Sequence, residues 1–273
     1  MASLKESDDV KAWIIFLYLT MKVRLTKRKT KTKKQKQNQT YRLRGGSSES
    51  IALCIPMDAG DVSMLHVCLR SVKQQTRAPD SVYISISGVT PESEATIKQI
   101  IADSMIPNIN VKFHPEKILA GGNRNLAASA AVDAGATILS FIDADDSMHP
   151  NRIERLLDIF KNPSITGVVH SYSIGKKAEI NAENPIQWPS LTGQVLTDVL
   201  VAGKGGTFRT ISPKSGHECH VANGHVSVRA DFFRDNNYNE RLTLGEDQDF
   251  NASILLAGKV LAFTPDVLSM YYT

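Results

Sequence analysis

Three carboxylates stand within four residues of the chain, at Asp143, Asp145 and Asp146. They follow the apolar segment Ala136–Ile142, which the pattern predicts to be a buried strand. Acidic residues are common in turns and helix caps. Three so close together, however, repel one another unless a cation lies among them. The cluster therefore favours a site for Mg²⁺ or Mn²⁺, ions that take oxygen ligands and share them with substrate phosphates.

The segments around this cluster alternate between strand and helix patterns. The predicted strands are Ile51–Ile55, which Pro56 ends, then Ser81–Ser87, Ile109–Phe113 and Ala136–Ile142. The predicted helices are Val62–Gln75, Pro91–Ser104 with Thr90 as its cap, Asn123–Ala134, Pro150–Phe160 and, further on, Glu246–Leu256. Such alternation indicates an α/β fold with a parallel sheet flanked by helices. Ligands bind such sheets at the carboxyl ends of the strands, where the acidic cluster is expected.

Composition narrows the function classes. A length of 273 residues and a hydrophobic content of 42% allow a packed core and exclude a wholly disordered chain. No apolar run approaches the about 20 residues that a membrane-spanning helix needs. Residues 1–44 carry 13 Lys/Arg against 3 Asp/Glu, and the rest of the chain carries 19 against 25. A body with a net charge of −6 gives no reason to expect specific nucleic-acid binding.

Residues 1–48 are predicted to be a basic, disordered tail with one short apolar segment, 12–19. Residues 22–44 hold 11 Lys/Arg, which suit an anionic membrane surface as well as plain solvation. Both interpretations stay open, as does a true start at Met21. Residues 49–273 are predicted to form one domain. We expect a cytoplasmic protein, with peripheral attachment to a membrane as the sharper alternative.

Several short motifs occur in a fixed order along this domain. They are Ile55-Pro56, Cys68 to Thr76, Gly121 to Ala127, Phe141 to Asp146 with Pro150 and Arg152 beyond it, Asn223 to Arg229, and Gly245 to Asp249. Each is weakly specific alone, but together the chain resembles a family 2 glycosyltransferase with the GT-A fold. The resemblance covers roughly residues 50–272. It implies a single Rossmann-like domain with a central, mostly parallel sheet flanked by helices.

The resemblance also implies how a nucleotide-sugar donor binds. Pro56 corresponds to a residue that borders the nucleotide pocket. Arg124 and Asn125 correspond to residues near the nucleotide and its diphosphate, and Asp143 corresponds to the acid near the ribose hydroxyls. Gly224 lies in the segment that lines the acceptor and donor-sugar site. These positions are the expected donor site.

A metal and a base are implied in the same way. Asp145, with Asp146 as a helper, corresponds to the acid that holds Mn²⁺ or Mg²⁺ on the diphosphate, where the cation neutralises the leaving group. Asp247, with Glu246 beside it, corresponds to the catalytic base of inverting members, which activates a weakly nucleophilic hydroxyl. Acidic residues are also favourable in the first turn of a helix. That alternative is competitive for Asp249 and weaker for Asp247.

Three features depart from the family pattern. The second strand ends in Ser85-Ile86-Ser87-Gly88 without the carboxylate that usually reads the base, so Ser87 or Thr90 is expected to substitute. No Gln-x-x-Arg-Trp motif follows Asp247, which argues against a processive polymerase. No histidine follows His225 as a carboxy-terminal metal ligand. The histidines of residues 216–225 match no zinc spacing, and we interpret them as surface residues, with loop histidines near an acceptor pocket as the alternative.

These features together predict an inverting, metal-dependent, non-processive hexosyltransferase. It would move a single sugar from a nucleotide sugar, expected to be a UDP-sugar, to a hydroxyl of a glycan, protein or lipid acceptor. One alternative is a phosphatase of the haloacid dehalogenase type that uses Asp143 and Asp145, although its motif normally follows the first strand. The other is a non-enzymatic module that acts through its basic tail.

Overall fold

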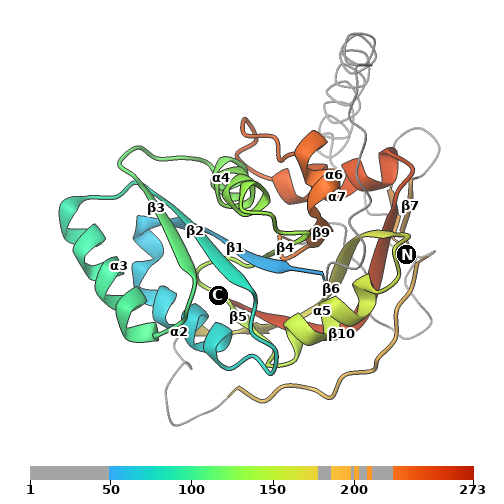
Figure 1. Cartoon of the computed structure of the whole chain (residues 1–273), viewed down its shortest axis with the longest axis horizontal. Coiled ribbons are helices and arrows are strands. Elements are labelled where there is room, and N and C mark those ends of the chain that lie inside the picture. The colour runs from blue at the N-terminus through green and yellow to red at the C-terminus, as the bar shows by residue number, and fades with distance from the viewer. Residues whose placement is uncertain (1–48, 178–185, 198–199, 203–207, 211–223) are drawn as a thin grey trace, which may run out of the picture. The chain divides into compact units, whose positions relative to one another are not determined.

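The computed structural model describes residues 49–177, 186–197, 200–202, 208–210 and 224–273 (Figure 1). The predicted basic tail, residues 1–48, and the histidine-containing segment 216–223 lie outside these ranges. Within the described ranges, no helix has both the length and the apolar character that a membrane span requires.

Strands and helices alternate through the first half of the domain, as the sequence predicts. The elements are β1 (Ile51–Asp58), η1 (Ala59–Asp61), α2 (Val62–Lys73), β2 (Ser81–Ser87), α3 (Pro91–Ser104), β3 (Ile109–His114), α4 (Ala120–Asp133), β4 (Ile138–Phe141), β5 (Ser147–Met148) and α5 (Arg152–Phe160). The second half is richer in strand. Its elements are β6 (Ile165–Gly175), β7 (Leu200–Ala202), β8 (Phe208–Thr210), β9 (Ser227–Arg229), α6 (Ala230–Asp235), α7 (Glu246–Leu256) and β10 (Val260–Tyr272).

The main sheet has the strand order β3-β2-β1-β4-β9-β6-β10-β5. Strands β3, β2, β1 and β4 are parallel, and so are β6 and β10. Between these two groups lies β9, which runs antiparallel to both β4 and β6. The sheet is therefore mostly parallel, and the carboxyl ends of β1 and β4 meet at one edge.

Strand β1 continues past Pro56 to Asp58, two residues beyond the Pro56 that was predicted to end it. The carbonyl of Cys54 accepts a bond from Ile142 at the end of β4. Two residues further on, Pro56 faces the same side, where β4 has already ended at Phe141. The missing N–H of Pro56 therefore costs no ladder hydrogen bond, and pairing with β2 carries the strand on to Asp58.

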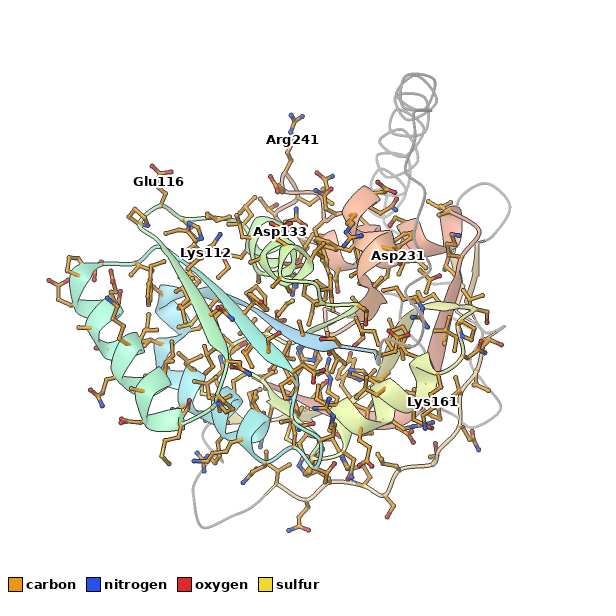
Figure 2. All side chains as sticks on the ribbon, in the orientation of Figure 1. Lys112, Glu116, Asp133, Lys161, Asp231 and Arg241 are labelled. Atoms are coloured by element: carbon orange, nitrogen blue, oxygen red, sulfur yellow. The ribbon has the colours of Figure 1, made fainter. Side chains whose placement is uncertain are left out.

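Helices cover both faces of the sheet (Figure 1). Alternation along β1 sends Ala52 and Cys54 to the face covered by α4, α6 and α7. Leu53 and Ile55 point to the opposite face, under α2 and α3, while α5 packs on the same side beside β6. Many charged side chains point outward from this core, as Glu116 and Arg241 show in Figure 2.

Candidate active site

A pocket of about 590 Å³ lies at the carboxyl ends of β1 and β4. Its wall includes five carboxylates, an arginine and a proline, most of which the sequence analysis singled out. They are Pro56, Asp58, Asp61, Asp143, Asp145, Glu246 and Arg124, together with Asn123 and Lys117. Five acidic side chains thus face one pocket at the sheet edge where α/β folds bind their ligands.

Arg124 joins two of the predicted site residues. Its Nη2 donates to Asp143 Oδ1 at 2.7 Å, and its Nη1 donates to Glu246 Oε1 at 2.5 Å. The guanidinium is nearly buried, so it is largely unavailable to a ligand except at the pocket wall. Burial alone would raise the pKa of Asp143, but Arg124 and His225 hold it well below its usual range. Asp143 is therefore an anion at neutral pH.

Gly224 packs directly against this pair. A Cβ on Gly224 would lie 2.8 Å from Arg124 Nη2 and 3.4 Å from Asp143 Oδ2. The backbone of residue 224 can approach the Arg124–Asp143 pair this closely only because no side chain intervenes. The structure thus brings together Gly224 and Asp143, which are far apart in the sequence.

His225 lies at the centre of a second cluster behind Asp143. Its Nε2 is 3.0 Å from Asp146 Oδ2 and 3.7 Å from Asp143 Oδ2. Ligand atoms of these three residues lie within 4.8 Å of one another, so together they could hold a metal ion. Burial alone would lower the pKa of His225, but hydrogen bonds and charges from Asp143 and Asp146 raise it instead.

The interpretation of His225 as a surface residue is wrong, because its side chain is fully buried. Nδ1 contacts Ser269 Oγ at 2.8 Å, and the ring stacks on Tyr271 with centroids 4.3 Å apart. No ligand spacing marks this histidine in the sequence. Only the short strand β9 that follows it, turned antiparallel into the sheet, brings it beside Asp143.

The side chains of Asp145 and Asp146 point to different surroundings. Asp145 lines the pocket, and its Oδ2 accepts from Lys177 Nζ at 3.1 Å. Asp146 is buried, and its Oδ1 accepts from the backbone N–H of Tyr272 at 3.1 Å. The two predicted metal ligands therefore face different surroundings, with Asp145 open to the pocket and Asp146 joined to His225.

Asp247 lies in the first turn of α7, next to Glu246. Gly245 caps this helix with φ of +76°, a left-handed conformation that favours glycine. Asp247 Oδ1 accepts from the N–H of Gln248 at 2.7 Å. Burial raises the pKa of Asp247 despite that bond, and the charge of Glu246 raises it further. A carboxylate with a raised pKa is a stronger base, as the predicted role requires.

Two predicted residues make internal hydrogen bonds. Asn125 donates to the carbonyl of Tyr238 at 3.0 Å and to Glu240 Oε1 at 2.9 Å. The buried hydroxyl of Ser87 accepts from Asn123 Nδ2 at 2.9 Å. Asn123 itself lines the pocket, so Ser87 reaches the pocket through Asn123.

Sequence reasoning missed several pocket residues. Asp58 pairs in register with Ser87, and its Oδ2 lies 3.3 Å from Lys117 Nζ. Burial raises the pKa of Asp61, and Asp145 and Asp58 add to this effect. Asp58 is the last residue of β1 and Asp61 lies three residues beyond it, much as Asp143 lies just beyond β4. The rule that ligands bind at carboxyl ends of strands could have found them, had it been applied beyond Pro56.

Acidic side chains at the carboxyl edge of a mostly parallel sheet suit a ligand that carries phosphates and shares a divalent cation with the protein. Comparison with known proteins agrees with this class. The family model for glycosyl transferase family 2 matches residues 58–216, more than half of the chain. The chain belongs to the glycosyl transferase family 2. The match ends before Gly224 and Asp247.

Relatives and solved structures point the same way. An uncharacterized glycosyltransferase of Nostoc sp. is 26% identical over 155 residues, which are 54% of this chain and 44% of that protein. TarS of S. aureus, solved with UDP, superposes with a TM-score of 0.57 at 12% identity, covering 82% of this chain and 60% of that one. Its complex with UDP-GlcNAc gives a TM-score of 0.55 at 12% identity over 82% and 58%. The fold is that of GT-A glycosyltransferases. The chain spans less than two thirds of either relative.

Proposed function

We propose that this glycosyltransferase is inverting and metal-dependent, and moves one hexose from a UDP-sugar to a hydroxyl of a glycan, protein or lipid. The observation that carries the proposal is the pocket that gathers Asp143, Asp145 and Glu246 at the carboxyl ends of β1 and β4. Asp247 lies one residue along the helix from Glu246. The phosphatase alternative gains no support from the family match.

The donor is proposed from fold and chemistry together. TarS, which shares the fold, has been solved with UDP and with UDP-GlcNAc. At 12% identity this supports the place of the donor more than its base or its sugar. A pocket of about 590 Å³ has room for a nucleotide sugar, since ligand pockets span about 300–1,000 Å³. Pro56 and Arg124 line this pocket, and we propose Ser87, Asn125 and Gly224 as further residues of the donor site.

The residues present fit a divalent cation. Asp145 offers a pocket-facing carboxylate, while Asp146, Asp143 and His225 offer three ligand atoms close together. Carboxylates with one imidazole suit Mn²⁺, and carboxylates with water suit Mg²⁺. A bound cation would stabilise the charge that develops on the departing diphosphate. We propose Asp145 and Asp146 as its ligands, with His225 as an additional candidate.

The chemistry of this chain's own side chains is proposed as follows. Asp247 accepts the proton of the acceptor hydroxyl while the hydroxyl oxygen bonds to the anomeric carbon of the donor sugar. The bond from that carbon to the diphosphate breaks on the opposite side, which inverts the configuration. Arg124 keeps Asp143 and Glu246 in place while this happens. Because the sequence lacks the motif of processive polymerases, we propose a non-processive enzyme that adds a single sugar to its acceptor.

The test is calorimetric titration of the full chain with UDP, GDP and CDP, with and without Mn²⁺. We expect binding of one nucleotide, strengthened by Mn²⁺ and lost in Asp145→Ala. Asp133→Asn, on the exposed end of α4, is the control and should bind normally. Selective hydrolysis of one nucleotide sugar by the same samples would identify the donor sugar. A folded protein that binds none of the nucleotides would contradict the proposal.

A further inference from the structure

Arg152, the first residue of α5, is fully buried beneath the acidic site. Its Nη2 donates to the carbonyl of Phe141 at 2.7 Å and to the carbonyl of His225 at 2.9 Å. Its Nε and Nη1 have no hydrogen-bond acceptor, and the described residues offer it no ion pair. A buried arginine that binds backbone rather than a carboxylate is unusual, since buried charges are normally paired.

The position of these two carbonyls explains what the arginine connects. The hydrogen bond from Phe141 N–H to the carbonyl of Val226 lies at the end of the β4–β9 pairing, where the two strands separate toward the site. Arg152 bridges the next carbonyls on either side, those of Phe141 and His225. Beyond them lie Asp143 on one chain segment and the imidazole of His225 on the other. The Arg152 side chain thus links the two chain segments just beyond the last backbone hydrogen bond between β4 and β9.

The energetics favour a role beyond packing. Removing a guanidinium from water is unfavourable, and an apolar residue of similar size would avoid that cost. A guanidinium stays protonated in proteins, so Arg152 is a buried cation. Tyr271 and Cys68 lie close enough to act on this charge, and so do the carboxylates of Asp143 and Asp146. Its compensating charge therefore lies in the site above it.

We propose that Arg152 is a positioning residue for the donor and cation site. It sets the separation between the Asp143–Asp146 turn and His225, and its charge offsets the repulsion among the acids. This inference rests on the proposed function, because the consequence is measured as cation-dependent nucleotide binding. It assigns a role to a residue that touches neither the pocket nor the proposed substrates.

Arg229 provides a control, although it is partly exposed and also pairs with Glu49 at 2.8 Å. It also donates to backbone carbonyls, those of Phe160 at 2.7 Å and Ile165 at 2.8 Å. It stands at the carboxyl end of β9, whereas Arg152 binds just before the start of that strand, on the side of the site. Arg152→Met and Arg229→Met should both lower the melting temperature of the full chain. Only the first should disturb the site.

The experiment titrates Mn²⁺ and UDP into wild type, Arg152→Met, Arg152→Lys and Arg229→Met, at a temperature where all four are folded. Removing an outer partner of a metal site typically costs about 10–100-fold in affinity, so that loss in Mn²⁺-dependent UDP binding is expected for Arg152→Met. Arg152→Lys keeps the charge and should recover part of the affinity. Arg229→Met should bind like wild type.

Two outcomes would overturn the inference. One is wild-type affinity in Arg152→Met, and the other is an equal loss of affinity in Arg229→Met, which would make both effects a matter of general stability. If the wild-type protein itself bound no nucleotide with Mn²⁺, the proposed function would fail instead. The wild-type titration thus separates the two failures.

Discussion

At the scale of single residues, the site is organised by close approaches that leave little room. Arg124 occupies the space between Asp143, Glu246 and the backbone of Gly224. Each contact depends on the others, because the guanidinium cannot shift toward one carboxylate without leaving the second. The residues that hold the site are therefore as constrained as those expected to contact substrate.

Gly224→Ala tests this constraint. A methyl group 2.8 Å from Arg124 Nη2 must displace the guanidinium, which two ion pairs hold in place. Overpacking of this kind costs about 1–3 kcal/mol. We expect a fall in unfolding free energy of that size together with weaker UDP binding, measured by denaturation and calorimetry. Normal values of both would show that the pair has room to move.

Asp247→Asn tests the proposed base. We expect transfer to fall by about 10²–10⁴-fold, the usual contribution of a general base, while UDP binding persists. In the wild type, the base must be deprotonated to act. Because burial raises the pKa of Asp247, the acid limb of the rate profile should fall at a pH above the ordinary aspartate value of about 3.9. Full transfer by Asp247→Asn would remove the assignment.

At the scale of elements, the sequence predicts segments best where local signals agree. Helix α3 has its predicted bounds because Thr90 and Ser93 form a capping box and Pro91 follows the cap. Helix α4 begins at Ala120, before the predicted Asn123, and includes Gly121 and Gly122.

Tertiary contacts explain the difference at α4. A Cβ on Gly121 would lie 3.0 Å from the carbonyl oxygen of Asn239, and a Cβ on Gly122 would lie 2.7 Å from Ile118. These glycines allow a close approach, whereas sequence alone presents them as a loop. His225 was missed for a similar reason, since only the pairing of β9 with β4 places it beside Asp143.

Asp266 on β10 holds the segment that follows β6. The buried carboxylate accepts from the N–H and hydroxyl of Thr192, the N–H of Gly193 and Arg155 Nε. Asp266→Ala leaves these donors unpaired and should cost about 3 kcal/mol of unfolding free energy. Asp158→Ala, which removes only exposed ion pairs, is the control and should cost less than about 1 kcal/mol.

The same residue predicts a pH dependence of stability. Burial alone would raise the pKa of Asp266, but hydrogen bonds from Thr192 and Arg155 lower it below its unfolded value. Its contribution is then fully present above the unfolded pKa of about 3.9 and is lost as the pH falls through the lower folded pKa. The stability difference between wild type and Asp266→Ala should shrink over that range. A constant difference would mean that the charge of Asp266 is not what stabilises the segment.

At the scale of the whole molecule, the segregation of charge assigns sugar transfer to the acidic body and any membrane attachment to the basic tail. Residues 1–44 carry a net charge of +10, and the remainder carries −6. Deletion of residues 1–44 should leave donor binding and transfer unchanged, because every proposed site residue lies beyond it. The alternative of membrane attachment predicts that the full chain binds vesicles that contain phosphatidylserine, that salt weakens this binding, and that deletion of the tail abolishes it. If a folded, truncated protein lost transfer, that result would favour the alternative in which the protein acts through its basic tail.

The place of β9 in the sheet has a consequence for how the chain folds. This short strand, Ser227–Arg229, lies between β4 and β6 in the sheet. It is nevertheless synthesised more than 50 residues after β6 ends at Gly175. Until those residues leave the ribosome, the edges of β4 and β6 lack the partner that later covers them. Unpaired strand edges are prone to wrong pairing, so the interval of synthesis between β6 and β9 is when this protein most needs protection by chaperones.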